Sequence, residues 1–223
     1  MGAQVTEDAQ VTEDWGEITS EAELRRLVGE PHQVVHRKES ATFGAFERQW
    51  LAASPFCLLA TSAADGRCDV SPRGDPPGFA LLLDDSTLAL PDRPGNRRAD
   101  SWLNILSNPR VGLVFLVPGR GDTLRVNGRA RLVSRAPFLD RMTVRGNRPA
   151  LALVVSAEEI YFHCAKSALR ARLWQPETWQ PEAVASRARI AQATEWTEKS
   201  LAELKQRYGP AYEQHLYPNE RTP

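Results

Sequence analysis

Apolar residues in the middle of the chain alternate with polar ones or form short compact runs, and both patterns predict β-strands. The predicted strands occupy residues 56–61, 67–72, 79–83, 87–90, 111–117, 123–133, 152–155 and 159–163. Tight turns at 63–66 and 84–86 and a glycine-containing connection at 118–121 join neighbouring strands as hairpins. Hairpin order favours a small antiparallel barrel and disfavours a Rossmann fold.

Apolar positions at helical spacing predict helices before, inside and after these strands. One helix begins at the N-cap pair Thr19-Ser20 and ends at Gly29. Others are predicted at 42–53, 97–107, 137–144 and 167–174 and within 178–212. The predicted helix at 42–53 packs on the main domain through Phe43, Phe46 and Trp50. The expected fold class is mostly β with peripheral helices (α+β), with one helix inserted after the fourth strand.

Composition and charge are those of an ordinary globular protein. The 223 residues include 28 basic and 28 acidic side chains, so the formal charges cancel. Balanced charge predicts no general affinity for nucleic acid or for an anionic membrane. The three cysteines, Cys57, Cys68 and Cys164, form no CxxC pair. Their number and spacing argue against a metal site or a disulfide scaffold and indicate buried or half-buried thiols.

The first residues of the chain are acidic and polar, with a near-repeat of Ala-Gln-Val-Thr-Glu-Asp at 3–8 and 9–14. They lack the basic start and the apolar stretch of a signal peptide. No apolar run approaches the ~20 residues that span a bilayer. We therefore expect a cytoplasmic protein.

The segment 91–98 carries the most informative chemistry, because Arg97 and Arg98 lie where a helix is predicted to start. Unpaired backbone N–H groups make a helix start positive, so arginines are unfavourable there unless an anion binds. Asn96 is a suitable N-cap residue, and Gly95 allows close approach of a ligand. The segment therefore indicates a phosphate site. The alternative is that both arginines pair at the surface with Asp92 or Asp100.

Several motifs occur in the order typical of the pyridoxamine 5′-phosphate oxidase-like family, which the chain resembles over about residues 54–174. They are Ala60-Thr61, Asp65-Gly66-Arg67, Ser71-Pro72-Arg73-Gly74, Asn96-Arg97-Arg98, the segment 108–115 and the segment 126–130. The similarity is greatest to its bacterial flavin-nucleotide-binding branch. The resemblance implies an antiparallel FMN-binding split β-barrel that works as a homodimer, with a flavin in each of two clefts between the subunits.

The resemblance also implies a division of the chain and a set of cofactor-binding residues. Residues 1–53 are a tail and helices packing on the barrel, 54–174 form the FMN-binding split-barrel domain, and 175–223 form a C-terminal helical extension. The family's phosphate-binding Ser-Arg-Lys triplet falls on Asn96, Arg97 and Arg98. The other implied cofactor-binding residues are Ser71, Pro72, Arg73, Gly74, Pro91, Asp92, Lys166, Arg170 and Trp174.

The chemistry of flavins supports two of these positions. A fixed positive charge near N1 and the C2 carbonyl of the ring raises the reduction potential, and Arg73 and Lys166 are candidates for it. The alternative for the segment 73–78 is a stiff loop with an internal pair between Arg73 and Asp75. His163 and Cys164, at the end of the last strand, are interpreted as structural residues.

The function expected from the resemblance is FMN binding and a flavin-dependent oxidoreductase activity on an unidentified small substrate. The alternative is a non-catalytic protein that binds or stores flavin, or binds heme or a deazaflavin, and a third possibility is an interaction module. Catalytic residues remain unknown, because no side chain stands out as an acid or a base. The family's oxidases grip the vitamin's phosphate with a C-terminal arginine and histidine that this chain does not match, so pyridoxamine phosphate is not expected as the substrate.

Overall fold

The structure is a computed structural model that describes residues 15–32, 39–210, 212 and 216–217, and the near-repeat of residues 3–14 lies outside them. Residues 1–37 and 38–223 form two separate units. In the first unit, helix α1 (Glu21–Val28) begins after Ser20, whose hydroxyl caps the helix, and ends at Gly29 with φ 77°. Both limits confirm the predicted helix. None of the helices in the described residues is long and apolar enough to cross a membrane.

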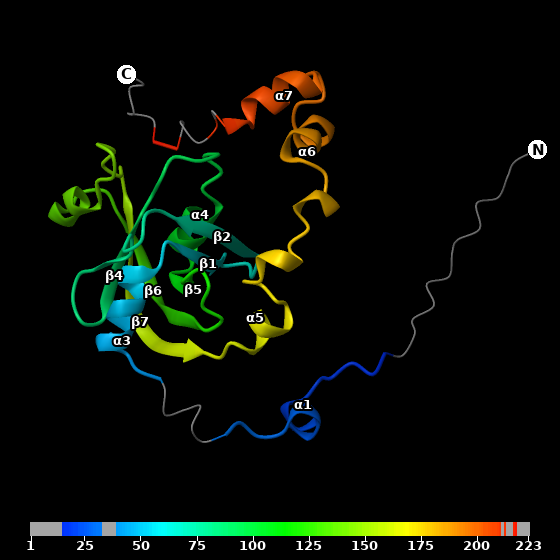
Figure 1. Ribbon diagram of the computed structural model, residues 1–223. Coiled ribbons are helices and arrows are strands. Elements are labelled where there is room, and N and C mark those ends of the chain that lie inside the picture. Colours follow the sequence, from blue (N-terminus) through cyan, green and yellow to red (C-terminus); the bar gives the residue numbers. More distant parts are fainter. Residues whose placement is uncertain (1–14, 33–38, 211, 213–215, 218–223) are drawn as a thin grey trace, which may run out of the picture. The chain divides into compact units, whose positions relative to one another are not determined.

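The second unit contains one antiparallel sheet, whose seven described strands follow the order β2-β1-β5-β6-β7-β4-β3 (Figure 1). The strands are β1 (Phe56–Ser62), β2 (Cys68–Gly74), β3 (Leu81–Leu82), β4 (Thr87–Pro91), β5 (Arg110–Leu116), β6 (Thr123–Val133) and β7 (Ala152–His163). The hairpins β1–β2, β3–β4 and β5–β6 are the predicted ones. Helix α4 (Asp100–Ser107) follows the fourth strand, as expected.

Strand β7 is a single strand where two short strands, 152–155 and 159–163, were predicted. Its pairing with β6 joins Gly128 to Ala157 and Asn127 to Glu159, so one residue, Glu158, is bulged out of register. A Cβ atom on Gly128 would lie 2.1 Å from the carbonyl oxygen of Ser156, so only glycine fits there. The gap between the two predicted strands is therefore a bulge inside one strand.

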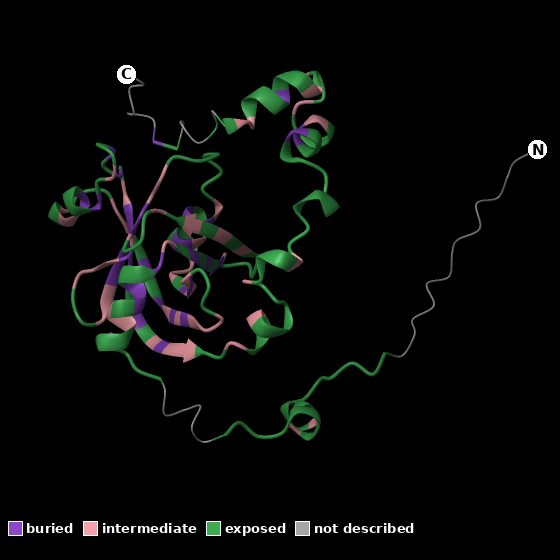
Figure 2. Cartoon of the chain, in the orientation of Figure 1, coloured by how far each residue is buried: buried purple, intermediate pink, exposed green. Residues whose placement is uncertain are grey.

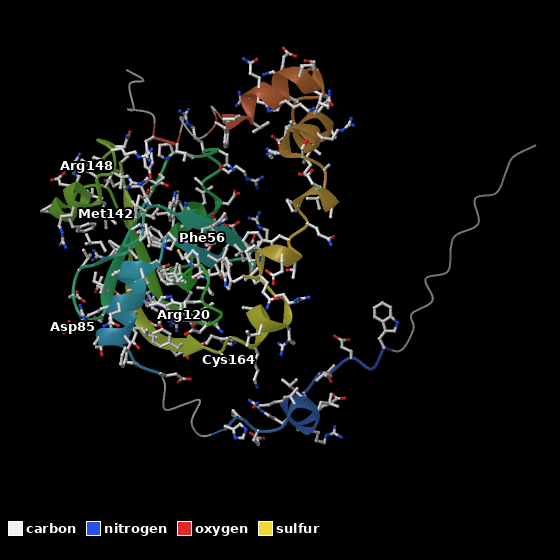
Figure 3. All side chains as sticks on the ribbon, in the orientation of Figure 1. Phe56, Asp85, Arg120, Met142, Arg148 and Cys164 are labelled. Atoms are coloured by element: carbon white, nitrogen blue, oxygen red, sulfur yellow. The ribbon has the colours of Figure 1, made fainter. Side chains whose placement is uncertain are left out.

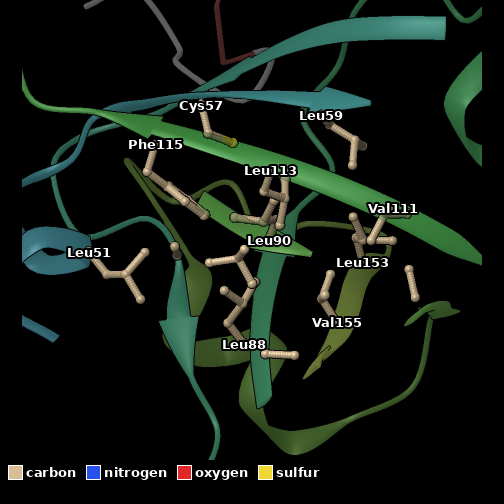
Figure 4. Close-up of a cluster of buried hydrophobic side chains, with 14 of the residues drawn as sticks. Leu51, Cys57, Leu59, Leu88, Leu90, Val111, Leu113, Phe115, Leu153 and Val155 are labelled. Carbon is tan, nitrogen blue, oxygen red and sulfur yellow. The ribbon is translucent and has the colours of Figure 1, made fainter. Parts of the chain in front are cut away.

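The inner faces of strands that are distant in the sheet share one hydrophobic core. Cys57 and Leu59 of β1 belong to the same buried cluster as Leu88 and Leu90 of β4, although β5, β6 and β7 lie between these strands in the sheet (Figure 4). A flat sheet could not bring them together, so the sheet is coiled around its core. The architecture is the expected α+β antiparallel split barrel.

Helix α3 (Ala45–Ala53) lies against this core through Trp50 and Leu51, which are both buried. The indole N–H of Trp50 donates to the carbonyl oxygen of Phe115 at 3.2 Å. Phe43 precedes the helix and is also buried, but Phe46 is 73% exposed. The predicted packing face is therefore wrong at Phe46, because the helix starts at Ala45 and turns that side chain outward.

The remaining predicted helices are shorter than expected. The segment predicted at 137–144 is the 3-10 helix η1 (Pro137–Met142), and α5 (Lys166–Arg170) follows β7. Over the stretch 178–212, which was predicted to be helical, and just before it, the chain forms four short helices: η2 (Pro176–Thr178), η3 (Pro181–Ala183), α6 (Arg187–Thr194) and α7 (Leu201–Arg207). Helices α6 and α7 enclose a small core of their own around Ala188, Ala191 and Leu204. Buried residues otherwise concentrate in the strands of the sheet (Figure 2).

Candidate functional site

The side chain of Arg73, near the end of β2, reaches the first turn of α4. Its Nη2 donates to the hydroxyl of Ser101 at 3.1 Å, and its guanidinium carbon lies 4.2 Å from the centre of the Trp102 ring. Its Nη1 lies 3.9 Å from the carboxylate of Asp92, which follows β4. The ends of β2 and β4 therefore meet at α4, and the structure brings together two predicted residues, Arg73 and Asp92.

Two further contacts complete this group, which we call the Arg73 cluster: Asp69, Arg73, Asp92, Ser101 and Trp102. The Ser101 hydroxyl donates to Asp69 at 2.7 Å, and the Trp102 indole N–H donates to Asp92 at 3.2 Å. Burial raises the pKa of Asp92, while the Arg73 guanidinium opposes that rise. Burial lowers the pKa of Arg73, and the carboxylate of Asp92 opposes the change. The cluster is thus a partly buried set of charges that hold one another in place.

One polar atom of the cluster has no partner. The Nε atom of Arg73 is buried and makes no hydrogen bond within the described residues. A buried donor without a partner costs free energy, on the order of 1–3 kcal/mol. The sequence had suggested Arg73 as a cofactor residue but gave no sign of Ser101 or Trp102, whose roles depend on where α4 packs.

The segment between β4 and α4, residues 92–99, is called the arginine loop below. Arg97 and Ala99 both have left-handed backbone, with φ of 61° and 59°. Helix α4 begins at Asp100, with Ala99 as its N-cap and no side chain capping it. The prediction that the helix begins at Arg97 with Asn96 as N-cap is therefore wrong. The side-chain oxygen of Asn96 instead accepts a hydrogen bond from the backbone N–H of Arg98 at 3.0 Å, which stabilises the turn before the helix.

The two arginines of the predicted triplet differ in their surroundings. Arg98 Nε donates to Asp100 at 2.7 Å in an exposed pair, which confirms the surface-pairing alternative for this residue. Arg97 is exposed, and its side chain makes no hydrogen bond or ion pair with any described residue. Exposed pairs contribute little stability, so a ligand could compete with Asp100 for Arg98.

The arginine loop also contains a buried ion pair that the sequence did not reveal. Arg93 Nε donates to Asp75 at 2.7 Å, and these side chains are only 14% and 1% exposed. Asp75 follows the predicted residues Arg73 and Gly74 at the end of β2. The alternative of an internal Arg73–Asp75 pair is wrong, because each of these residues pairs across to the loop that follows β4.

The other residues predicted on these two strand ends differ in exposure. Ser71 is half-buried, whereas Pro72 and Gly74 are exposed on the outer side of β2. Strand β2 is an edge strand, where a proline removes no hydrogen bond that the sheet needs. Pro91 is buried and pairs with Ala152 of β7.

The predicted residues after β7 lie in a different setting. Lys166 and Arg170 are exposed at the two ends of α5. The indole N–H of Trp174 donates to the backbone carbonyl of Arg120 in the β5–β6 connection at 2.7 Å. Within the described residues, no hydrogen bond or ion pair joins these three residues to the arginine loop. The structure thus does not bring them together with Arg73 in one chain. His163 and Cys164 are also exposed. Cys68 is exposed as well, so the prediction of buried or half-buried thiols is wrong for Cys68 and Cys164 and confirmed for Cys57.

A concave region lies between α3 and the β5–β6 connection, away from the Arg73 cluster, with a volume of about 450 Å³. Its lining residues include Phe46, Trp50, Phe162, Arg120 and Asp122. The Arg120 guanidinium lies over the Trp50 ring at 5.2 Å and pairs with Asp122 at 2.7 Å. The sequence did not indicate this groove, although the exposed Phe46 on α3 belongs to it.

The described strands and helices define the class of the protein as an α+β split barrel, with a charged cluster where β2, β4 and α4 meet. A family model described as pyridoxamine 5′-phosphate oxidase matches residues 45–164, more than half of the chain. The chain therefore belongs to the pyridoxamine 5′-phosphate oxidase family. A search of the curated proteins finds no match.

Similar solved structures include three bacterial proteins. A variant of HupZ from Group A Streptococcus is 17% identical, and the match covers 54% of this chain and 99% of that chain with a TM-score of 0.45. A candidate pyridoxamine 5′-phosphate oxidase from Lactobacillus delbrueckii is 21% identical over 56% and 98% of the two chains, with a TM-score of 0.44. A protein of the pyridoxinephosphate oxidase family from Clostridium acetobutylicum, related to general stress protein 26, is 14% identical over 52% and 83%, with a TM-score of 0.40.

Proposed function

We propose that the protein binds FMN and acts as a flavin-dependent oxidoreductase on a small substrate. Members of the family bind flavin nucleotides. The observation that carries the choice of a phosphorylated flavin is Arg97, an exposed guanidinium without a partner among the described residues, held just before the uncapped start of α4.

The arginine loop suits a phosphate group for three reasons. No side chain caps α4, so the first N–H groups of the helix are available to an anion. Arg97 adds a positive charge at the same place, Arg98 adds a second that is paired with Asp100, and arginine donates to phosphate in a bidentate manner. The left-handed backbone at Arg97 costs free energy, and such strain occurs most often at ligand sites.

The Arg73 cluster would lie toward the ring of the flavin. When bound, the flavin supplies the two-electron chemistry, and the protein supplies orientation and charge. Ser101 and Trp102 fix the Arg73 guanidinium, and the orphaned Nε of Arg73 is a donor not yet used. Ser71 and Gly74 on the same strand end would offer backbone groups to the polar edge of the ring. The proposed cofactor residues remain those given by the sequence, with Lys166, Arg170 and Trp174 contributed across a subunit interface.

The proposal includes a homodimer, because the outer face of β1 and β2 is apolar and exposed. Phe56, Leu58 and Val70 are 36%, 37% and 61% exposed, and Leu58 lies opposite Pro72 (Figure 3 labels Phe56). A contiguous apolar patch on a sheet marks an interaction surface. The proposed partner on this face is a second copy of this chain. In such a dimer, residues such as Lys166 of one subunit would lie next to the flavin bound by the other subunit.

Titration of the purified protein with FMN and with riboflavin tests the proposal. We expect FMN to bind more tightly than riboflavin, and NADPH to bleach the bound flavin, with the colour returning in air. Bound flavin that no nicotinamide reduces, with or without added substrates, would support the non-catalytic alternative. A protein that binds neither flavin would refute the proposal.

Sedimentation of the wild type beside Leu58→Glu tests the dimer, which the substitution should dissociate.

A further inference from the structure

The carboxylate of Asp75 connects three segments that are far apart in the sequence. The side chain is 1% exposed, and its Oδ2 accepts a hydrogen bond from Nε of Arg93 in the arginine loop and forms an ion pair with the same guanidinium. Its Oδ1 accepts a hydrogen bond from the hydroxyl of Tyr217, near the C-terminus. Both oxygens of a buried carboxylate are thus satisfied, one by the arginine loop and one by the C-terminal segment.

Arg93 is held on all sides of its guanidinium. Besides Asp75, its Nη1 donates to the carbonyl of Asn147 at 3.0 Å and its Nη2 to the carbonyl of Met142 at 2.6 Å. Met142 ends the 3-10 helix η1 (Figure 3). Arg93 therefore anchors the start of the arginine loop to the body of the barrel.

Tyr217 covers this anchor. Its ring lies 5.7 Å from the guanidinium carbon of Arg93 and 5.6 Å from that of Arg145, and the residue is only 9% exposed. Burial and the Asp75 carboxylate raise the pKa of Tyr217 to about 12. The hydroxyl therefore stays protonated at neutral pH and keeps donating to Asp75.

We propose that Tyr217 is a positioning residue for the cofactor site: by completing the Asp75–Arg93 pair it fixes the arginine loop in the form that receives a phosphate. This inference rests on the proposed function. Asp75 comes directly after Gly74, and Arg93 comes directly after Asp92, so the pair joins the strand end that would face the flavin ring to the loop that would bind its phosphate. The described contacts of Tyr217 are with Asp75, Arg93 and Arg145, which are not among the proposed cofactor residues, so Tyr217 would act through the pair.

The physical reason lies in what the loop lacks. Arg97 and Ala99 have left-handed backbone, and the Arg97 side chain makes no hydrogen bond or ion pair with a described residue. Beyond Arg93, the side-chain hydrogen bonds of the described loop are local, from the Arg98 N–H to Asn96 and from Arg98 to Asp100. The position of the loop therefore depends on the two residues that join its start to the barrel, Asp92 and Arg93. Loss of the Tyr217 hydroxyl would admit water to Asp75 and weaken its ion pair with Arg93. Part of the binding free energy of a phosphate would then be used to order the loop, and the affinity would fall.

The experiment compares the affinities of FMN and riboflavin, which differ only in the phosphate, in wild-type protein and in Tyr217→Phe and Tyr217→Leu. The phenylalanine variant keeps the ring on Arg93 and loses only the hydroxyl, whereas the leucine variant loses both. We expect the preference for FMN over riboflavin to fall about tenfold in Tyr217→Phe and further in Tyr217→Leu, because hydrogen bonds to charged groups have effects of about this size. Riboflavin affinity itself should stay within about twofold.

Tyr212→Phe is the matched control, because Tyr212 lies in the same C-terminal segment, is 50% exposed and packs on the ring of Tyr208. It should leave the preference for FMN unchanged. Equal loss of FMN and riboflavin affinity in Tyr217→Phe would show a general structural role and overturn the inference, as would no change at all. If wild-type protein binds neither flavin, the proposed function fails first. If wild type discriminates and the Tyr217 variants discriminate equally well, only the inference fails.

Discussion

Removal of the Arg97 guanidinium is the most direct test of the phosphate site. In Arg97→Ala no hydrogen bond or ion pair among the described residues is broken, and the left-handed backbone at φ 61° is retained. The free energy of unfolding should therefore change by less than about 0.5 kcal/mol. A charged hydrogen bond to phosphate contributes about 1.5–3 kcal/mol, so FMN affinity should fall about 10- to 150-fold.

Calorimetric or fluorescence titration with FMN and riboflavin, each at low and moderate salt, measures this effect. Riboflavin should bind Arg97→Ala and wild type equally, because it has no phosphate. Arg97→Lys should recover part of the FMN affinity, since lysine keeps the charge but not the bidentate geometry. Arg131→Ala is the matched control, because Arg131 is an exposed arginine on strand β6. The difference between FMN and riboflavin should shrink with added salt.

Two results would refute the reasoning. Unchanged FMN affinity in Arg97→Ala and in the double variant with Arg98→Ala would show that no phosphate rests at the start of α4. An equal loss for FMN and riboflavin would show that Arg97 acts on the fold or on the flavin ring.

Three further predictions concern packing. Burial raises the pKa of Cys57 to about 12, so Ellman's reagent at pH 8 should titrate the exposed Cys68 and Cys164 in the folded protein and reach Cys57 only after denaturation; three fast thiols would contradict this. Gly128→Ala puts a Cβ atom 2.1 Å from a carbonyl oxygen, so thermal melting should show a loss of about 1–3 kcal/mol or more, and an unchanged melting temperature would be inconsistent with the bulge. Leu204→Ala opens the core between α6 and α7, so limited proteolysis should remove the C-terminal helices faster while the barrel resists, and identical digestion patterns would argue against that separate core.

Local sequence patterns were sufficient for most of the β-sheet. Alternation of apolar and polar residues along β6 places Leu124 and Val126 on the buried face, and the turns after β1 and β3 fix the register of their hairpins. These features depend on neighbours in the sequence, so the sequence alone determined them. The order of the sequence motifs also indicated the family, and the family model matches residues 45–164.

Contacts between distant segments decided what the sequence could not. The pairings of Arg73 with Asp92 and of Asp75 with Arg93 each cross from β2 to the loop after β4, where spacing alone suggested a local pair. Helix α4 starts at Asp100 and not at the predicted Arg97, because left-handed backbone at Arg97 and Ala99 precedes it. No residue type in this loop indicates that conformation. The contact between Tyr217 and Asp75 exists only in the folded barrel, since 142 positions separate them in the chain. Ion pairs between segments that are distant in the chain have no local sequence pattern, whereas strands and turns have one.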